Sequence, residues 1–432
     1  MKKIIFIFPL VALLLTTACS ETEPDLPKPY ELVREDITFP YIADNALTVK
    51  VGQLIRIETQ SISDEGVSYE WSLDGEVIAQ TKNLEYMIET IGQYELVLTA
   101  VQGAMGFTYP IALTIDFGQI DPPMEGASPY ITQVFDYRPA PGQFVNKLPK
   151  YEDGDTQETM NAKALAAIGA DKRQMITLGS YGGYVTVGFD HTIENKEGLR
   201  DFRIIANAFY ADANPDPNAP RGGSCEPGII MVAYDLNDNG KPDDDEWYEI
   251  AGSSHIDATK EAFYPKAKAA GKDVNFYFQN YNLTYTKPSS EPDKEDYTTY
   301  ISWTDNKGGK GYLPKNTFHS QPYYPQWITD EVMRFHGSRL PQNGVDESGE
   351  GNYFVLYRFG FGYADNAANN EADAAIDIDW AVDKEGKPVN LPGVDFIKIY
   401  CGVNQVNGWL GECSTEITGV EDLHLLKEEI KK

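Results

Sequence analysis

The sequence predicts an all-β protein that consists of a small β-sandwich followed by a larger one. Its apolar residues fall into short runs, which Gly, Asn and Asp turn residues separate. Within "GQYELVLTAV", Leu96, Leu98 and Ala100 recur at every second position, as in a strand that buries one face. Helical periodicity is confined to three short segments, residues 161–170, 262–271 and 421–432.

A chain of 432 residues is long enough for two to three domains. The smaller sandwich is expected to end where a Gly- and Pro-rich linker begins, and the larger one has the many short strands and tight turns of a jelly-roll-like sandwich. The predicted segments are a signal peptide at 1–18, an acidic tether at 19–29, the small domain at 30–117, a linker at 118–129, the large domain at 130–426 and a tail at 427–432.

The first 19 residues read as an export signal. Two lysines precede an apolar run, and small residues lead to Cys19, in a segment too short to span a bilayer as a mature helix. The junction resembles a bacterial lipobox, which implies cleavage before Cys19 and a lipid on its sulfur. We therefore expect an outer-membrane lipoprotein that is anchored by its lipid and exposed at the cell surface. The alternative is an ordinary secreted protein that is cut nearby.

The charge balance limits the partners that the chain can bind. It has 66 acidic against 36 basic residues, a net charge of −30. Proteins that bind nucleic acid or anionic lipid neutralise phosphates with Lys and Arg, so both classes are excluded. An acidic surface instead suits divalent cations and neutral ligands such as sugars or large cofactors.

Three cysteines remain once Cys19 is assigned to lipid. They are Cys225, Cys401 and Cys413, an odd number, and none has the C-x-x-C spacing of a zinc or redox site. Cys401 and Cys413 are the pair closest in sequence. The spacing leaves open whether they form a disulfide.

Two parts of the chain carry a resemblance to known proteins. Residues 30–117 resemble a PKD-type immunoglobulin-like domain, in which Tyr69 and Trp71 would be the buried aromatic pair and residues 92–101 the late strand. Beyond it, the chain resembles Bacteroidetes cell-surface lipoproteins that carry a PKD-type domain. The motifs concerned are "TLGSYGGYVTVGFDHTIEN", "DFRIIANAF", "SCEPGIIMVAYDLNDNGKPDDDEWYEIAGS", "ISWTDN", "FHSQPYYPQWI", "FGYADN", "IDIDWAVD" and "NGWLGECSTEITGVEDLH".

The resemblance implies a location and a class of protein. Members are described as cell-surface proteins, and some resemble the accessory lipoproteins of TonB-dependent outer-membrane transporters for corrinoids or glycans. It therefore implies a ligand-binding or transporter-assisting role and does not name a substrate.

The stretch "DLNDNGKPDDDE" has the residue pattern of the twelve-residue calcium loop of an EF-hand, between two predicted strands instead of two helices. Gly240 falls at position 6, where the loop must bend. The sequence thus predicts a connection between strands that a bound calcium ion holds together. The alternative is an acidic solvated hairpin. The predicted ligands are Asp235, Asn237, Asn239, Lys241 through its backbone carbonyl, Asp243 and Glu246.

Aromatic and amide clusters give a second set of candidates, for contact with a small-molecule or glycan ligand. Aromatic rings held beside prolines can stack on a sugar or a planar macrocycle, and nearby amides and carboxylates can hydrogen-bond to it. Burial in the sandwich core is the alternative for the aromatic residues. These candidates are His319, Tyr323, Tyr324, Trp327, Trp303, Asp305, Asn306, Tyr363, Asp365 and Asn366.

A further carboxylate group, Asp377, Asp379 and Asp383, predicts either a second cation site or a solvated strand edge. No pattern indicates an enzyme, because the five histidines form no H-E-x-x-H and no G-x-S-x-G occurs. We expect a non-catalytic surface lipoprotein that captures a glycan or corrinoid-like ligand or assists a TonB-dependent transporter, stabilised by calcium. The alternatives are a calcium-dependent carbohydrate-active enzyme and a structural adhesin.

Overall fold

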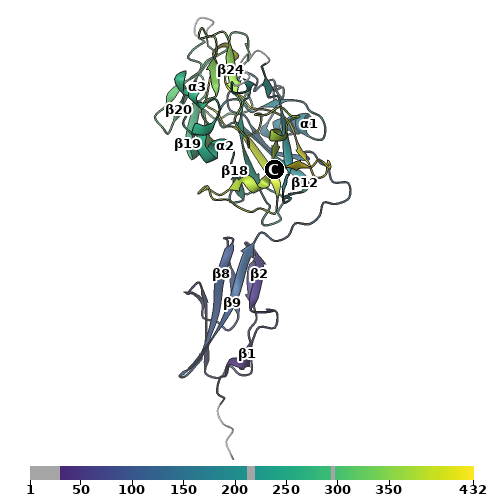
Figure 1. Ribbon diagram of the computed structural model, residues 1–432, viewed down its shortest axis with the longest axis vertical. Coiled ribbons are helices and arrows are strands. Elements are labelled where there is room, and N and C mark those ends of the chain that lie inside the picture. Colours follow the sequence, from purple (N-terminus) through teal and green to yellow (C-terminus); the bar gives the residue numbers. More distant parts are fainter. Residues whose placement is uncertain (1–29, 212–218, 293–296) are drawn as a thin grey trace, which may run out of the picture. The chain divides into compact units, whose positions relative to one another are not determined.

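The computed structural model describes residues 30–211, 219–292 and 297–432, so the predicted signal peptide, Cys19 and the acidic tether lie outside it. The described chain forms two units, which meet in sequence between Asp116 and Phe117. Strands predominate in both units (Figure 1), and the prediction of an all-β sandwich protein is confirmed. None of the helices in the described ranges combines the length and the apolar composition that a membrane crossing requires.

The smaller unit is built on one five-stranded sheet, in which β5, β6, β8 and β9 pair in antiparallel fashion. In it β2, β9 and β8 lie side by side, and β5 and β6 follow (Figure 1). The alternation predicted for the strand at residues 92–101 is present, since Leu96, Leu98 and Ala100 are all buried while Glu95 is exposed. The strands of this unit are β1 (Ile37–Thr38), β2 (Ala46–Lys50), β3 (Leu54–Ile57), β4 (Gln60–Ser61), β5 (Val67–Leu73), β6 (Glu76–Ala79), β7 (Leu84–Met87), β8 (Gly92–Gln102) and β9 (Met105–Asp116).

The larger unit is built on a six-stranded and a four-stranded antiparallel sheet. The first has the strand order β10-β12-β27-β17-β18-β26 and the second β11-β28-β14-β25. These strands are β10 (Gln133–Arg138), β11 (Ile176–Thr177), β12 (Tyr184–Glu194), β14 (Phe202–Ala206), β17 (Gly228–Ala233), β18 (Trp247–Ile250), β25 (Ala375–Ile376), β26 (Ala381–Val382), β27 (Gly393–Cys401) and β28 (Glu416–Asp422).

Strand register decides which face of the six-stranded sheet enters the core. Val187 of β12 and Val232 of β17 both lie opposite Ile397 of β27, and all three side chains are fully buried. Because side chains alternate along a strand, the neighbouring residues Thr186, Met231 and Lys398 lie on the opposite face. β28 is buried along its whole length, so the core of the unit extends through both sheets.

Smaller sheets complete the larger unit. One sheet has the order β21-β20-β19-β22, another β15-β16-β24-β23, and β13 pairs with β29 near the end of the chain. Their strands are β13 (Leu199–Arg200), β15 (Phe209–Tyr210), β16 (Gly222–Ser224), β19 (Tyr277–Thr286), β20 (Ile301–Asp305), β21 (Lys310–Leu313), β22 (Val332–Arg339), β23 (Gly344–Asp346), β24 (Phe354–Tyr357) and β29 (Ile430–Lys431).

Among its described residues, the larger unit has three α-helices, α1 (Gln157–Ile168), α2 (Ser253–Asp257) and α3 (Tyr264–Ala269). The prediction of a helix over residues 421–432 is wrong, since this segment contains a turn and then β29. Asp422 is the reason for the turn, because its Oδ1 accepts the N–H of His424 at 2.7 Å. Ile430 then lies opposite Arg200 of β13, so strand pairing prevails over the helical periodicity.

The three described cysteines are all buried and free. The Sγ atom of Cys401 lies 3.3 Å from the backbone oxygen of Cys413, as a thiol that donates a hydrogen bond to it. In this structure, therefore, Cys401 and Cys413 are neighbours in the core without a disulfide.

Candidate functional site

A cavity of about 300 Å³ in the larger unit contains an unusual concentration of acid groups. Glu226, Glu412 and Glu416 line it, together with amide side chains such as Asn407 and apolar ones such as Phe144. Glu226 lies between β16 and β17, and Glu416 is the first residue of β28. The cavity therefore joins segments that are distant in sequence.

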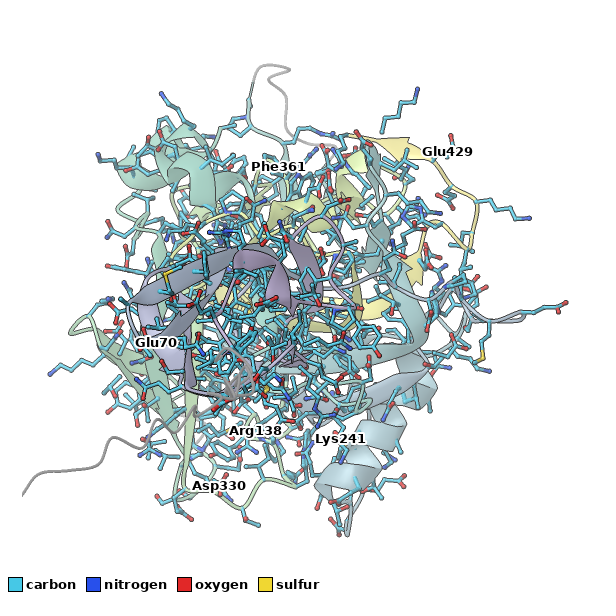
Figure 2. All side chains as sticks on the ribbon, turned by 90° about the horizontal axis from the view of Figure 1, so that it is seen from below. Glu70, Arg138, Lys241, Asp330, Phe361 and Glu429 are labelled. Atoms are coloured by element: carbon cyan, nitrogen blue, oxygen red, sulfur yellow. The ribbon has the colours of Figure 1, made fainter. Side chains whose placement is uncertain are left out.

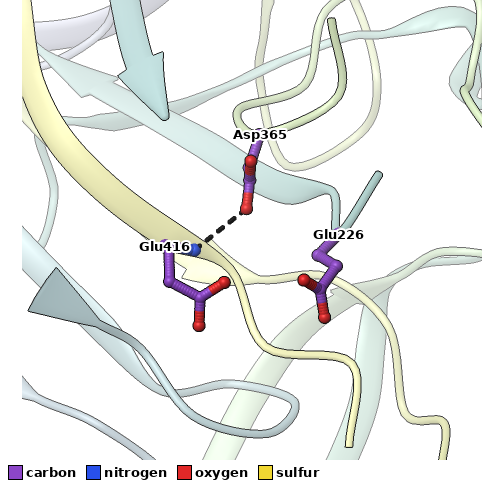
Figure 3. A group of neighbouring side chains, drawn as sticks. All are labelled: Glu226, Asp365 and Glu416. Atoms are coloured by element: carbon purple, nitrogen blue, oxygen red, sulfur yellow. Dashed lines mark hydrogen bonds between the residues drawn. The ribbon is translucent and has the colours of Figure 1, made fainter. Parts of the chain in front are cut away.

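Asp365, one of the predicted ligand contacts, completes a group of three carboxylates with Glu226 and Glu416. Each supplies an oxygen atom, and these oxygens all lie within 4.8 Å of one another. Figure 3 shows the three side chains converging, with the backbone N–H of Glu416 donating to Asp365 Oδ2 at 3.0 Å. We call these three residues the carboxylate triad. Asp365 and Glu416 are buried, and Glu226 is partly buried.

Only neutral groups donate hydrogen bonds to the triad. Glu226 accepts the N–H of Ser414 at 3.0 Å and the hydroxyl of Ser224 at 3.1 Å, and Glu416 accepts the hydroxyl of Thr177 at 3.0 Å. In the described part of the chain, no Lys, Arg or His forms an ion pair with any of the three. At the surface, by contrast, carboxylates form ion pairs with Lys and Arg side chains.

One such surface ion pair joins Arg138 to Asp330, whose Nη2 and Oδ2 atoms are 2.8 Å apart (Figure 2). Exposed pairs of this kind contribute little to stability. The triad is different because burial removes the water that would otherwise screen its charges.

Burial raises the pKa of Glu226, Asp365 and Glu416 above its ordinary range, and for both glutamates repulsion from the neighbouring carboxylates raises the pKa further. Burial likewise raises the pKa of Glu412 to about 7. Glu412 Oε1 accepts the N–H of Gln143 at 2.6 Å, whereas Oε2 has no hydrogen-bond partner among the described residues. The carboxyl groups of the cavity can thus keep their protons, or they can bind a cation in place of those protons.

Aromatic side chains lie next to this cavity. Trp409, half exposed, precedes the lining residue Leu410. The ring of His319, a predicted ligand contact, packs edge-on against the lining residue Phe144, with ring centres 4.8 Å apart. Of the predicted ligand contacts, Asp365 thus belongs to the triad and His319 packs against a residue that lines the cavity.

The exposure assumed for the other aromatic candidates is contradicted by the structure. Tyr323, Tyr324, Trp327 and Tyr363 are buried in the core of the larger unit. Their polar atoms are used internally, as where Tyr324 donates its hydroxyl hydrogen to the backbone oxygen of Asp330 at 2.7 Å. Burial in the core is the more common outcome for aromatic residues in a β-sandwich.

The polar candidates mainly hold turns. Asp305 Oδ1 accepts the N–H of Lys307 and of Gly309 in the turn after β20, which also contains exposed Asn306. Trp303 is half-buried within β20 itself. Asn366 is buried, and its amide bonds both the N–H and the oxygen of Phe359.

The further carboxylate group, Asp377, Asp379 and Asp383, is also used within the fold. The Nζ atom of Lys432 lies 3.1 Å from Asp377 and also pairs with Asp379, while Asp383 accepts N–H groups of its own turn. The ammonium group of Lys432 therefore pairs with two of the three acids that the sequence suggested as a second cation site.

The predicted calcium loop, Asp235 to Glu246, connects β17 to β18 and is held by its own side chains. The two oxygens of the Asp235 carboxylate accept the N–H groups of Asn239 at 3.1 Å and Gly240 at 2.7 Å. Glu246, 1% exposed, accepts the N–H of Asp243 at 3.1 Å. The first and last predicted ligands thus lie at the two ends of one compact loop, and both hold its backbone through hydrogen bonds.

The remaining predicted ligands lie within the same loop. The amides of Asn237 and Asn239 both donate to Asp243 Oδ2, at 2.8 and 2.7 Å, and the N–H of Lys241 donates to Asn239 Oδ1. Gly240 has a φ of 71°, which favours glycine. Carboxylate, amide and backbone oxygens are the donors that calcium prefers, so the residues present fit this cation.

An open cleft of about 340 Å³ lies on the outer face of the six-stranded sheet. Tyr184, Met231, Trp247 and Lys398 line it as half-buried side chains of four neighbouring strands, and exposed Arg334 of β22 adds a second basic group. The Nζ atom of Lys398 lies 4.1 Å from the centre of the Tyr184 ring. This cleft was not predicted from the sequence, although the alternation of Lys398 with the core residues Ile397 and Ile399 was a signal for it.

Gly182 lets β22 approach this sheet. Its φ is 87°, and a Cβ atom there would lie only 2.3 Å from Cβ of Phe335, which also lines the cleft. A side chain at position 182 would therefore push Phe335 and β22 away from the sheet.

Comparison with known proteins finds distant structural likenesses. No protein-family model and no curated protein matches the chain. A quinonprotein alcohol dehydrogenase-like protein from Bacteroides thetaiotaomicron aligns at 11% identity with a TM-score of 0.17, covering 38% of this chain and 36% of that one. A SusE-like protein, BT2857, aligns at 10% identity with a TM-score of 0.20, covering 90% of this chain and 97% of that one.

Proposed function

We propose that this protein is a non-catalytic, lipid-anchored surface protein that captures a nutrient ligand in the cleft on its outer sheet face. The ligand class is a glycan or a corrinoid-like cofactor, and calcium at the loop from Asp235 to Glu246 stabilises the binding face. The observation that carries the proposal is the convergence of Tyr184, Trp247, Lys398 and Arg334 on one open cleft.

The lining of the cleft has the chemistry of a binding surface. Half-exposed aromatic rings such as Tyr184 and Trp247 offer apolar faces on which a sugar or a macrocycle can stack. Lys398 and Arg334 can hydrogen-bond to hydroxyl or carboxylate groups of a ligand. Burial lowers the pKa of Lys398, and a carboxylate or hydroxyl oxygen of a ligand beside it would stabilise its charged form.

The calcium loop and the cleft are connected through the chain. Glu246 is the last predicted calcium ligand, and Trp247, the next residue, lines the cleft. A cation that orders the loop would therefore restrict the start of β18 and the position of the Trp247 ring. This coupling supports a calcium-dependent affinity for the ligand.

The anchor and the partner complete the proposal. Cys19 would carry the lipid, and the acidic tether would place the folded units outside the outer membrane. A TonB-dependent transporter would then receive the captured ligand. Labelling with radioactive palmitate tests the anchor, because Cys19→Ala would remove the label if lipid is attached there.

Replacing Trp247 by alanine tests ligand capture. The variant should bind the ligand at least about tenfold more weakly, since buried aromatic contacts dominate binding energies and tenfold corresponds to roughly 1.4 kcal/mol. Thermal-shift scans of the full chain against corrinoids, haem and surface glycans identify the ligand class, and isothermal titration then compares the affinities.

Trp409→Ala is the matched control, because Trp409 is also half exposed and does not line the cleft. It should leave the affinity unchanged. A loss of binding in Trp409→Ala with none in Trp247→Ala would move the ligand to the acidic cavity and contradict this assignment.

Replacing Asp235 by asparagine tests the calcium loop. Extracellular calcium sites bind at about 0.1 to 1 mM, so about 2 mM calcium should stabilise the wild type by about 0.6 to 2 kcal/mol. In Asp235→Asn this increment should fall, because the variant lacks the first carboxylate ligand. Melting in calcium and in EDTA gives the increment, and an increment of equal size in the variant would count against calcium in the loop.

A further inference from the structure

We infer that the carboxylate triad, Glu226, Asp365 and Glu416, is a second cation site, which binds a hard divalent cation of the calcium type inside the acidic cavity. This site is independent of the loop from Asp235 to Glu246 and of the ligand cleft. It brings together three segments of the larger unit that are distant in sequence (Figure 3).

The spacing of the three oxygens fits such a cation. Calcium binds oxygen at 2.3 to 2.6 Å, so two oxygens on opposite sides of the ion are about 4.6 to 5.2 Å apart. The triad oxygens lie within 4.8 Å of one another, inside that limit. A single ion can therefore contact one oxygen of each carboxylate with little movement of the side chains.

Among the described residues, no Lys, Arg or His forms an ion pair with the triad. Its hydrogen-bond donors there are the neutral side chains of Ser224, Thr177 and Asn207 and backbone N–H groups such as that of Ser414. Three carboxylates that face one another in a buried site repel, so they must either keep protons or share a cation. A divalent cation neutralises two of the three charges at once.

The unpartnered oxygen of Glu412 is an independent observation that points to a ligand in the cavity. This side chain is only 4% exposed and lines the same cavity as Glu226 and Glu416. Its Oε2 atom has no hydrogen-bond partner among the described residues. A buried carboxylate oxygen without a hydrogen-bond partner destabilises the folded state. A water molecule bound to the cation would supply that partner.

The donor set and the size of the cavity select the kind of cation. All three triad ligands are carboxylates and none is an imidazole or a thiolate, which favours calcium or manganese over zinc. Calcium takes six to eight oxygens, so three positions or more remain for waters. A cavity of about 300 Å³ has room for these ligands.

Counting bound calcium ions separates this site from the loop. Equilibrium dialysis of the full chain with calcium should find two ions in the wild type, one in Asp235→Asn and one in Glu416→Gln. The double variant should bind none. If the loop does not bind calcium but the triad does, the wild type and Asp235→Asn should each bind one ion and Glu416→Gln none.

Folding controls keep the test decisive. Glu416→Gln is isosteric and removes one repelling charge, so in EDTA it should melt at the same temperature as the wild type or higher. Glu385→Gln is the matched control, since it removes one exposed acid of the same unit and should leave the calcium count unchanged. Equal calcium counts in the wild type and Glu416→Gln would overturn the proposal and assign protons to the triad.

Discussion

Replacing Trp71 by alanine is expected to destabilise the smaller unit by about 3 to 5 kcal/mol, a large share of the stability of a domain of this size. Trp71 of β5 is fully buried, contacts Phe39 with ring centres 5.9 Å apart, and donates its indole N–H to the backbone oxygen of Lys82 at 3.4 Å. The variant loses the buried ring and leaves a cavity beside Phe39.

Calorimetry of the full chain measures this effect. Two transitions are expected, one for each unit, and only the transition of the smaller unit should move in Trp71→Ala. Val77→Ala is the control on the neighbouring strand β6, because Val77 is 53% exposed and its removal should change stability by less than about 0.5 kcal/mol. A shift of both transitions together would show that the units do not unfold independently.

Replacing Glu412 by glutamine should change how the stability of the larger unit depends on pH. Burial raises the pKa of Glu412 from 4.5 to about 7, so between these values the folded state keeps a proton that the unfolded state has lost. Folding free energy therefore becomes less favourable as the pH rises through this range. The change corresponds to about 3 kcal/mol in the wild type and should be absent from the variant.

Denaturant unfolding in EDTA at pH 5 and pH 8 provides the test. The stability of the wild type relative to Glu412→Gln should fall by about 3 kcal/mol from the lower to the higher pH. Glu385→Gln, which replaces an exposed glutamate of the same unit, should keep the pH dependence of the wild type. A difference between wild type and Glu412→Gln that is the same at both pH values would mean that Glu412 titrates normally in the fold.

The strands were predictable because their signal is local. Leu96, Leu98 and Ala100 alternate with exposed or half-buried neighbours, and this pattern depends only on the two-residue period of a strand. The same kind of reasoning failed for residues 421–432. There, Ile430 pairs with Arg200, and a distant strand outweighs the helical pattern.

The aromatic candidates show a second limit. Tyr323 and Trp327 stand in a Pro-rich stretch that resembles an exposed recognition loop, yet both rings are buried. Trp247, by contrast, stands in no such stretch, yet it lines the open cleft. Composition indicates which residues can stack on a ligand, but exposure depends on the elements that pack over each ring.

By itself, then, the sequence determined the all-β class and the loop from Asp235 to Glu246, because a strand period and a twelve-residue turn are both encoded by near neighbours. Only the tertiary structure brought Glu226, Asp365 and Glu416 within reach of one another, because each lies on a different segment and is unremarkable alone. The same holds for Tyr184, Trp247 and Lys398, since strand order and register place them on one face. Burial and charge repulsion arise from such neighbours, so the chemistry of both sites depends on the packed fold.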